Sequence, residues 1–241
     1  MRLVATDVDG TLTREGALAP EVLGAIARLV AAGIEVVPVS GRSAGEVLGI
    51  VRYLPGVRRG IAENGLVEVI PDAPVRLLGR DRVDGDPPAD RSQVREAARR
   101  IGDAVGLPLS PTPDDVFRIA DVAFERAGRT DEELGALAAA IRAESLHVTW
   151  SNVHVHVTRE PPDKGRAVLA AAGVEPLAIA TIGDAPNDAG LFVAGRFGLT
   201  VGTADVPRQA AVMPHMPEFV TAHPEAEAFL ELAAWLLLAR G

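Results

Sequence analysis

The chain has 241 residues, enough for one large domain or two small ones, and its 48% hydrophobic and 24% charged residues are typical of a globular protein with a core. Its 24 Lys and Arg residues face 33 Asp and Glu residues, and the formal net charge of −9 argues against a nucleic-acid partner. The lack of cysteine excludes a disulfide framework, a thiolate zinc site, an iron–sulfur cluster and a cysteine nucleophile.

Apolar runs and amphipathic patterns alternate over the N-terminal third of the chain. This order of strands and helices predicts parallel strands joined by helical crossovers, which is the α/β architecture. The expected elements are a strand at 3–6, a helix from Pro20 to its cap Gly33, a strand at 34–39, a helix opened by the capping box Ser43–Glu46 and ending at Leu54, and hairpin strands at 66–70 and 75–78 around the turn 71–74.

The pattern changes near Arg82, where the proline-rich segment 84–90 predicts a linker. A small α+β unit is expected next, and the first pattern resumes after Pro161 and Pro162. The middle unit is predicted as a helix at 92–105, a strand at 117–125, a helix opened by the capping box Thr130–Glu133, and strands at 146–151 and 153–158. The last part is predicted as a helix at 164–172 capped by Gly173, a strand at 177–182, a helix at 187–194, a strand at 197–201 and a helix at 224–239.

The fold class that follows is α/β, with a Rossmann-like parallel-sheet core and an inserted, smaller α+β domain. We expect residues 1–82 and 159–241 to form the split core and residues 83–158 to form the insert.

Two carboxylates follow the first predicted strand. Asp7 and Asp9 are two residues apart, so they point the same way if the strand continues that far. A calcium loop of the EF-hand type is excluded, because the positions for its glycine and its glutamate hold Leu12 and Leu18. A ligand site at the carboxyl end of a parallel strand remains, with a solvated turn as the alternative.

A second pair of carboxylates follows the predicted strand at 177–182. Asp184 lies at the strand end, and Asp188 lies in the first turn of the next helix, where backbone N–H groups favour anions. Helix capping is the alternative for either residue. Together with Asp7 and Asp9, they predict an oxygen-only site for a hard cation, best suited to Mg²⁺.

Lysine and asparagine are rare in this chain. Lys164 is its single lysine beside 23 arginines, and Asn64 and Asn187 are two of its three asparagines. A GC-rich coding background and a hot habitat both explain that bias. A position that keeps Lys or Asn against such a bias is expected to need it, so Lys164 is a candidate cation beside the carboxylates, with a solvated charge at a helix start as its alternative.

The segment Ser40-Gly41-Arg42 follows the second predicted strand. A hydroxyl and free backbone N–H groups at a strand end bind phosphate oxygens, although a simple turn explains Ser-Gly equally well.

Four segments occur along the chain in the order Asp7 to Asp9, Ser40 to Arg42, Asp163 to Gly165, and Asp184 to Asp188. Together they resemble the haloacid dehalogenase superfamily of phosphotransferases, and the resemblance covers the whole split core. It implies that Asp7 is the nucleophile that accepts the phosphoryl group. It also implies that Asp9 protonates the leaving oxygen and later activates water. A carboxylate nucleophile of this kind splits hydrolysis into two steps.

The same resemblance gives roles to the other residues. Ser40 and Lys164 are implied to hold the transferring phosphoryl group. The implied Mg²⁺ ligands are Asp7, the backbone carbonyl of Asp9, Asp184 and Asp188.

The position of the insert resembles the class IIB cap of that superfamily. Within this class, Glu63-Asn64-Gly65 and Asp163-Lys164-Gly165 look like the archaeal-type phosphoglycolate phosphatases and, more distantly, the sucrose- and mannosylphosphoglycerate-phosphatases. Asn64 is a candidate for substrate binding or a residue of a tight turn, and Asn187, Gly41 and Arg42 are further candidates for substrate binding.

The cap is expected to select the substrate. Phosphoglycolate carries a carboxylate, and Arg118 on the predicted strand 117–125 is the candidate cation, with a surface arginine as the alternative. His154 and His156 lie on one strand face, and His156 is near the place where related caps carry a histidine. Packing and substrate contact both remain open for these histidines, and a zinc pair would need further ligands.

The expected function is a Mg²⁺-dependent phosphomonoesterase with an aspartyl-phosphate intermediate and 2-phosphoglycolate as substrate. A phosphosugar phosphatase and a phosphomannomutase-like mutase are the alternatives within the superfamily. A phospho-accepting receiver module is the alternative outside it, although receivers have no insert of this size. We also expect the linkers at 82–90 and 159–162 to allow the cap to close over a small phosphorylated metabolite.

Location and assembly are inferred from the apolar segments. The run at 2–8 lacks the cleavage region of a signal peptide, and the longest apolar stretch, 232–239, is far below the ~20 residues of a membrane span. A cytoplasmic protein with no membrane partner is expected. Leu230, Trp235 and Leu238 either pack inside or form a homodimer interface.

Overall fold

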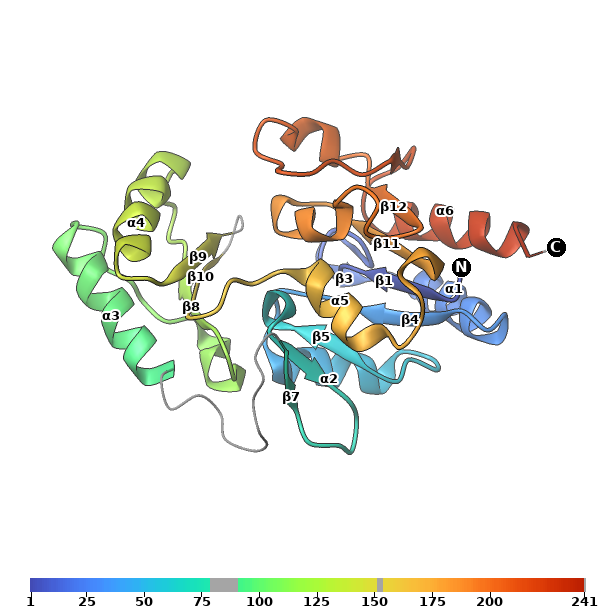
Figure 1. Cartoon of the computed structure of the whole chain (residues 1–241), viewed down its shortest axis with the longest axis horizontal. Helices are drawn as coiled ribbons and strands as arrows, with labels where there is room; N and C mark the ends of the chain where they lie inside the picture. The colour runs from blue at the N-terminus through green and yellow to red at the C-terminus, as the bar shows by residue number, and fades with distance from the viewer. Residues whose placement is uncertain (79–90, 151–153, 241) are drawn as a thin grey trace.

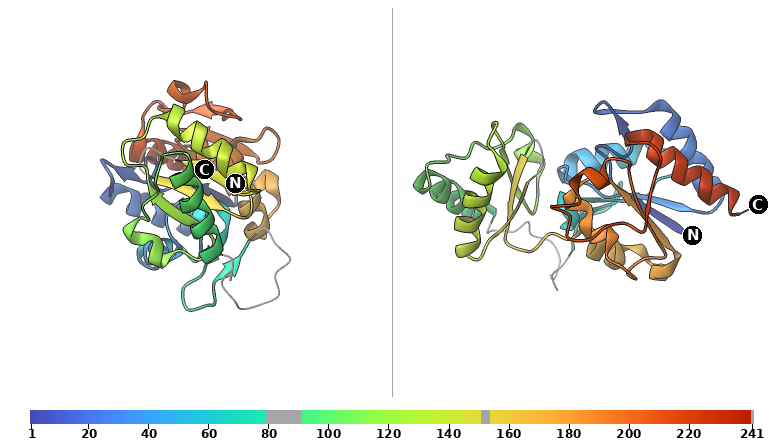
Figure 2. Two further views of the ribbon diagram at one scale, coloured as in Figure 1. Left: turned by 90° about the vertical axis from the view of Figure 1, so that its left-hand side faces the viewer. Right: turned by 90° about the horizontal axis from the view of Figure 1, so that it is seen from above.

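The computed structural model describes residues 1–78, 91–150 and 154–240. They form two lobes, a larger one with a parallel sheet and a smaller one that contains α3 and α4 (Figures 1 and 2). No helix in this part of the chain is long and apolar enough to cross a membrane.

The larger lobe contains a five-stranded, wholly parallel sheet, as predicted. β1 lies in the interior of this sheet, with Val4 opposite Val36 on one side and Ala180 on the other. The sheet order is β13 (Phe219–Val220), β12 (Leu199–Gly202), β11 (Ile179–Gly183), β1 (Leu3–Thr6) and β4 (Glu35–Pro38).

Alternate residues of these strands pack on opposite faces of the sheet. Val4 and Ala180 contact one apolar cluster, which contains residues of α1 (Pro20–Ala31), α2 (Ala44–Tyr53) and α6 (Glu225–Leu238). Leu3 and Ala5 belong to a second cluster with α5 (Lys164–Ala172). Because successive side chains of a strand point to opposite faces, the sheet has two buried faces, and each is covered by helices (Figure 1).

The predicted helix ends are confirmed at several caps. The Ser43 hydroxyl accepts a hydrogen bond from the Glu46 N–H, and Thr130 and Glu133 form the same capping box in α4. Gly173 ends α5 in the left-handed conformation with φ 63°, which glycine adopts without strain.

The smaller lobe has its own apolar core. Its two helices cover one antiparallel sheet, and the core residues all lie between Val94 and Val157. Its elements are α3 (Arg91–Ala104), α4 (Asp131–Ala143) and the strands β8 (Val122–Glu125), β10 (His154–Thr158) and β9 (His147–Trp150), in that sheet order. The predicted boundary between 82 and 83 lies outside the described residues, so the exact domain limits stay a prediction.

Several predicted elements differ from the structure. The prediction of a strand over 117–125 is wrong in its first half: residues Pro113–Phe117 form a 3₁₀ helix, and β8 begins only at Val122. The backbone N–H groups of residues 119–121 donate to a carboxylate of the larger lobe, so they cannot pair with a neighbouring strand. The predicted helix 187–194 is a 3₁₀ helix, Pro186–Phe192.

The predicted two-stranded hairpin is a three-stranded antiparallel sheet. The additional strand was not predicted, because its three residues are too few for a periodic pattern. This sheet consists of β5 (Gly60–Ala62), β6 (Val67–Val69) and β7 (Arg76–Leu77), and the short strands β2 (Thr13–Arg14) and β3 (Ala17–Leu18) form a further hairpin.

The strand order creates a switch point at β1. Its neighbour β4 follows it in sequence, whereas β11, on the other side, comes only after the smaller lobe. In open α/β sheets, ligands bind outside the carboxyl ends of the strands at such a point. Residues that follow Thr6 and Gly183 are therefore the first candidates for a site.

Gly165 allows α5 to approach the 3₁₀ helix Pro186–Phe192 closely. A Cβ atom at Gly165 would overlap the carbonyl oxygen of Gly190. This contact brings Lys164 next to Asp188, so the site depends on the absence of a side chain at Gly165.

We expect Gly165→Ala to destabilise the protein by about 1–3 kcal/mol, the usual range for overpacking, and to lower its activity. Thermal unfolding and the rate of the expected phosphomonoester hydrolysis would be measured together. Gly135→Ala is the matched control, because no atom lies within 4 Å of the Cβ that it adds to α4. An equal effect of both substitutions on the melting temperature would contradict the packing argument.

Candidate active site

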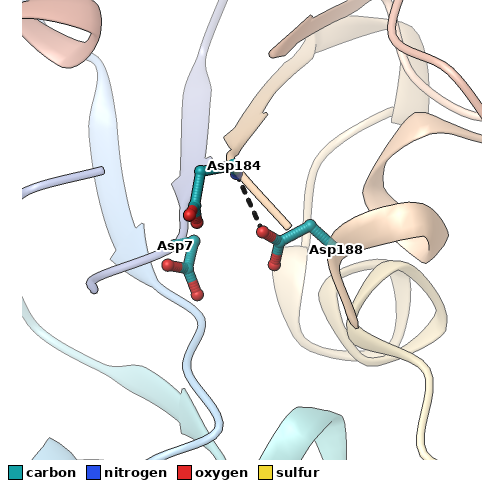
Figure 3. Close-up of side chains that lie close together, drawn as sticks. All are labelled: Asp7, Asp184 and Asp188. Atoms are coloured by element: carbon teal, nitrogen blue, oxygen red, sulfur yellow. Dashed lines mark hydrogen bonds between the residues drawn. The ribbon is translucent and has the colours of Figure 1, made fainter. Parts of the chain in front are cut away.

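Three carboxylates meet at the switch point. Asp7 follows β1, Asp184 follows β11, and Asp188 lies in the 3₁₀ helix Pro186–Phe192 (Figure 3). One oxygen from each carboxylate lies within 4.8 Å of the other two. Asp188 is held by its own loop, because its Oδ2 accepts the N–H of Asp184 at 2.9 Å and that of Ala185 at 3.1 Å.

Lys164 joins two of these carboxylates. Its Nζ donates to Asp7 Oδ1 and to Asp188 Oδ1, each at 2.6 Å, and its side chain is fully buried. Burial alone would lower the pKa of the Lys164 ammonium, but Asp188 and Asp7 outweigh it and hold that pKa above its ordinary value. Lys164 is therefore charged and fixed between the two carboxylates.

The cluster carries more negative than positive charge. Burial, and then the charge of Asp188, raises the pKa of Asp7 well above its usual range, although Lys164 acts in the opposite direction. Burial and Asp188 raise the pKa of Asp184 to about 8. A divalent cation would relieve both shifts, and three carboxylate oxygens are a donor set that fits a hard cation.

Asp9 lies apart from this cluster. β1 ends at Thr6, as predicted, so the condition under which Asp7 and Asp9 would share a strand face is not met: the Leu12 N–H bonds to the Val8 carbonyl at 2.8 Å, and Gly10 has φ 79°. A Cβ atom at Gly10 would lie 2.5 Å from Asp184 Oδ2, so only glycine permits this turn.

The Asp9 carboxylate pairs with Arg42 instead. Arg42 Nε donates to Oδ2 at 2.8 Å and Nη2 to Oδ1 at 2.7 Å, while Nη1 reaches Glu46 at 2.9 Å. The hydrogen bond to Asp9 contributes most to raising the pKa of Arg42. Arg42, predicted for substrate binding, thus has its guanidinium engaged by two carboxylates in this conformation.

Ser40 begins the predicted phosphate-binding segment and is buried. Its N–H bonds to the Ile61 carbonyl at 2.8 Å, and its Oγ accepts the N–H of Arg42 at 3.2 Å. Asn64 donates its N–H to the Ser40 carbonyl at 3.0 Å, and Asn187 Nδ2 donates to Asn64 Oδ1 at 3.3 Å. The structure therefore brings both predicted asparagines to this segment.

Arg118 lies where the smaller lobe meets the phosphate-binding segment. Its Nη1 donates to the Gly41 carbonyl at 3.1 Å and to Asp121, and its Nη2 donates to Asp114 at 2.7 Å. Asp121 also bonds to His156 Nδ1 at 2.8 Å. Burial acts to raise the pKa of Asp121, but Arg118 and His156 outweigh it and lower that pKa. Both predicted cap residues thus belong to one buried charged group.

His154 lies two residues before His156 on β10. Its ring lies edge-on to the ring of His156, with the centroids 6.0 Å apart. Burial is the main cause that lowers the pKa of His154.

Comparisons with known proteins identify the family of this chain. No family model matches the chain. A phosphoglycolate phosphatase of Methanoculleus marisnigri is 30% identical over 217 residues, which is 86% of each chain, and one of Methanopyrus kandleri is 27% identical over 84% of each chain. The chain belongs to the archaeal phosphoglycolate phosphatase family of the haloacid dehalogenase superfamily. It is a phosphatase.

Solved structures show the same fold for this phosphatase. A protein of Thermoplasma acidophilum has a TM-score of 0.79 at 19% identity and covers 99% of both chains. A sucrose-phosphatase of Synechocystis, solved with sucrose and phosphate, has a TM-score of 0.70 at 17% identity and covers 98% of both chains.

Two buried acidic residues of this phosphatase were not predicted. Glu63 belongs to a segment singled out for Asn64, and Asp121 stands within the predicted strand over 117–125. Asp121 interrupts the apolar run 119–124, which is a sign of a buried partner, whereas Glu63 is followed by Asn64 and Gly65 and gives no such signal. Burial, and then the charge of Asp121, raises the pKa of Glu63 to about 7, although backbone N–H groups act in the opposite direction.

The pKa of Asp184 predicts how the metal-free phosphatase responds to pH. Its folded value of about 8 lies above the ordinary 3.8, so between these values the folded state keeps a proton that the unfolded chain releases. The free energy of unfolding therefore falls as the pH rises through this window. The raised pKa of Glu63 likewise makes the free energy of unfolding fall as the pH rises towards about 7.

We expect the melting temperature of the metal-free protein to be lower at about pH 8.5 than at about pH 6. One pKa unit corresponds to about 1.4 kcal/mol, or about 3–5 °C for a chain of this size. Asp184→Asn should make the decrease smaller, and Mg²⁺ should stabilise the wild type more at the higher pH. A melting temperature that rises with pH in the metal-free protein would refute this assignment.

Proposed function

We propose that this phosphatase is a Mg²⁺-dependent phosphomonoesterase that forms an aspartyl-phosphate at Asp7 and hydrolyses 2-phosphoglycolate. The observation that carries the proposal is the Lys164 ammonium, 2.6 Å from both Asp7 and Asp188 at the switch point of the sheet. It prepares one buried carboxylate for nucleophilic attack and supplies a cation for the phosphoryl oxygens.

Asp7, Asp184 and Asp188 would hold the cation, together with the backbone carbonyl of Asp9. When bound, Mg²⁺ offsets the charge of the carboxylates and of the phosphoryl group. Lys164 engages Oδ1 of Asp7, so Oδ2 is the oxygen left to attack phosphorus.

The first step forms a bond between an Asp7 oxygen and phosphorus while the bond from phosphorus to the ester oxygen breaks. The leaving oxygen takes a proton from the Asp9 carboxyl group, and the alcohol departs. In the second step the Asp9 carboxylate takes a proton from water, whose oxygen attacks phosphorus. This releases inorganic phosphate and restores Asp7.

Arg42 must release Asp9 for this chemistry. Its two hydrogen bonds occupy both Asp9 oxygens. The Asp9 carboxyl group can reach the leaving oxygen only when its side chain leaves the guanidinium. Ser40 and the N–H group of Gly41 are the partners that we propose for the phosphoryl oxygens, whereas the Arg42 N–H is bonded to Ser40 Oγ in this conformation.

The choice of 2-phosphoglycolate is supported by the names of the relatives and by Arg118. That side chain contacts the Gly41 carbonyl, and its buried Nε has no hydrogen-bond partner among the described residues. We propose that Arg118, with His156 beside it, faces the carboxylate of the substrate. Asp114 and Asp121 offset its charge, so it adds orientation rather than net positive charge.

Asp7→Asn should lower kcat by about 10³-fold or more, because an amide cannot form the phosphoenzyme. Phosphate release is the measurement, and circular dichroism checks that the variant is folded. Asp103→Asn, an exposed change in α3, is the control with unchanged activity. Retained hydrolysis in Asp7→Asn would rule out the proposed nucleophile.

A panel of phosphomonoesters, assayed with and without Mg²⁺, tests the substrate. We expect kcat/KM for 2-phosphoglycolate to exceed that for hexose phosphates, sucrose phosphate and mannosyl-3-phosphoglycerate by at least about tenfold, or 1.4 kcal/mol. Chelation of the metal should abolish turnover.

Other outcomes of this panel would replace the proposal. A preference for sugar phosphates favours a phosphosugar phosphatase. Isomerisation without phosphate release indicates a mutase, and a long-lived phosphoprotein after treatment with acetyl phosphate indicates a signalling module.

A further inference from the structure

The carboxylate of Glu63 lies between the two lobes and is completely buried. Its Oε1 accepts the N–H of Ala44, at the start of α2, at 3.2 Å and that of Ile119 at 2.8 Å. Its Oε2 accepts the N–H groups of Ala120 at 2.7 Å and Asp121 at 2.9 Å. One side chain of the larger lobe thus binds three consecutive N–H groups of the smaller lobe.

This arrangement requires a carboxylate. Both oxygens face two N–H donors each, and above the pKa of Glu63, about 7, the ionised carboxylate has acceptor sites for all four. A glutamine at this position would turn an NH₂ group towards two N–H donors, so the isosteric amide would leave donors unpaired. Hydrogen bonds to a charged acceptor are also stronger than those to a neutral one.

The backbone at Glu63 is strained in support of this contact. Glu63, Asn64 and Gly65 have φ values of 53°, 56° and 101°, a run of left-handed residues of which only the last is glycine. Such conformations persist where surrounding contacts impose them, and they concentrate at functional sites.

The contacts that impose this conformation come from the active site. The N–H groups of Glu63 and Asn64 donate to the carbonyls of Arg42 and Ser40, each at 3.0 Å. Gly65 lies so close to Asp163 that a Cβ atom would be 2.7 Å from its carbonyl oxygen. The strained turn is therefore anchored to the phosphate-binding segment and to the residue before Lys164.

The segment that Glu63 binds carries the cap side chains of the site. Arg118 directly precedes the three N–H donors and reaches the Gly41 carbonyl at 3.1 Å, and Asp121 bonds to both Arg118 and His156. A shift of residues 119–121 away from Glu63 would therefore move Arg118 and His156 relative to Ser40.

We propose that Glu63 is a positioning residue: it fixes cap residues 118–121 on the phosphate-binding segment and so places Arg118 and His156 against the organic part of the phosphate ester. The inference rests on the proposed function for the identity of that ester. It assigns no chemical step to Glu63, and the binding of the phosphoryl group itself stays with Ser40 and Lys164.

The test compares Glu63→Gln with Glu68→Gln. Glu68 is the matched control because it is also a buried glutamate and lies in β6, just after the turn that contains Glu63, but its partners Arg59 and Arg76 lie in the larger lobe. Hydrogen exchange of the amides of 119–121 would be measured by NMR, together with KM for the best ester of the panel and the inhibition constant of inorganic phosphate.

In Glu63→Gln we expect the protection of these amides to fall at least tenfold while the amides of β1 and β11 stay protected. KM for the ester should rise at least fivefold, and the inhibition constant of inorganic phosphate should change less than twofold. Glu68→Gln should leave all three quantities near their wild-type values. Unchanged protection at 119–121 overturns the proposal, and so does an equal rise of KM and of the phosphate inhibition constant.

Ala120→Pro keeps the test decisive if Glu63→Gln does not fold. It deletes the N–H that Oε2 accepts without removing a large side chain, and it should lower protection at 119 and 121 and raise KM in the same direction. If folded Ala120→Pro shows wild-type amide protection at 119 and 121 and a wild-type KM, the proposal is overturned. If the wild type hydrolyses no ester of the panel, the proposed function fails, whereas the exchange data still decide whether Glu63 fixes the cap.

Discussion

A lysine ammonium buried between two carboxylates is the interaction on which this active site is built. Removing Lys164, Asp7 and Asp188 from water has a large cost, which their mutual attraction offsets only with close geometry, and both distances here are 2.6 Å. Burial and the nearby charge of Asp188 raise the pKa of Asp184, so ionising this third carboxyl group is unfavourable without a further cation. The protein thus holds three carboxyl groups at the point where a divalent cation would fit.

The fold produces this arrangement from segments that are far apart in the sequence. Asp7 and Asp184 follow paired parallel strands, so the register of β1 and β11 sets their spacing. Lys164 follows the smaller lobe in the sequence. It reaches the carboxylates only because Gly165 lets α5 approach Gly190. The close backbone contact between Gly165 and Gly190 therefore determines where the charge of Lys164 lies.

The sequence was sufficient to predict the residues at strand ends and helix starts. Short-range rules apply there: Ser43 caps its helix as expected, and the aspartates that follow two parallel strands are brought together by the sheet. Those rules failed where a long-range contact decided the local structure. Arg118 was placed on a strand, because nothing in its own segment reveals that the next three N–H groups are taken by Glu63. The pairing of Asp9 with Arg42 beside the turn at Gly10 escaped prediction for a similar reason, since the close approach of Asp184 to that turn lies outside any local pattern.

The separate apolar core of the smaller lobe has a consequence for how such enzymes diversify. Its buried side chains, from Val94 to Val157, form a cluster of their own, whereas Ile119 and Ala120 pack against the core of the larger lobe. We therefore expect a substitution inside the cap's own cluster to leave the packing around Asp7 and Lys164 unchanged. Selection can remodel the half that recognises the organic group while the half that handles phosphorus stays constant, so new specificities arise without rebuilding the catalytic apparatus.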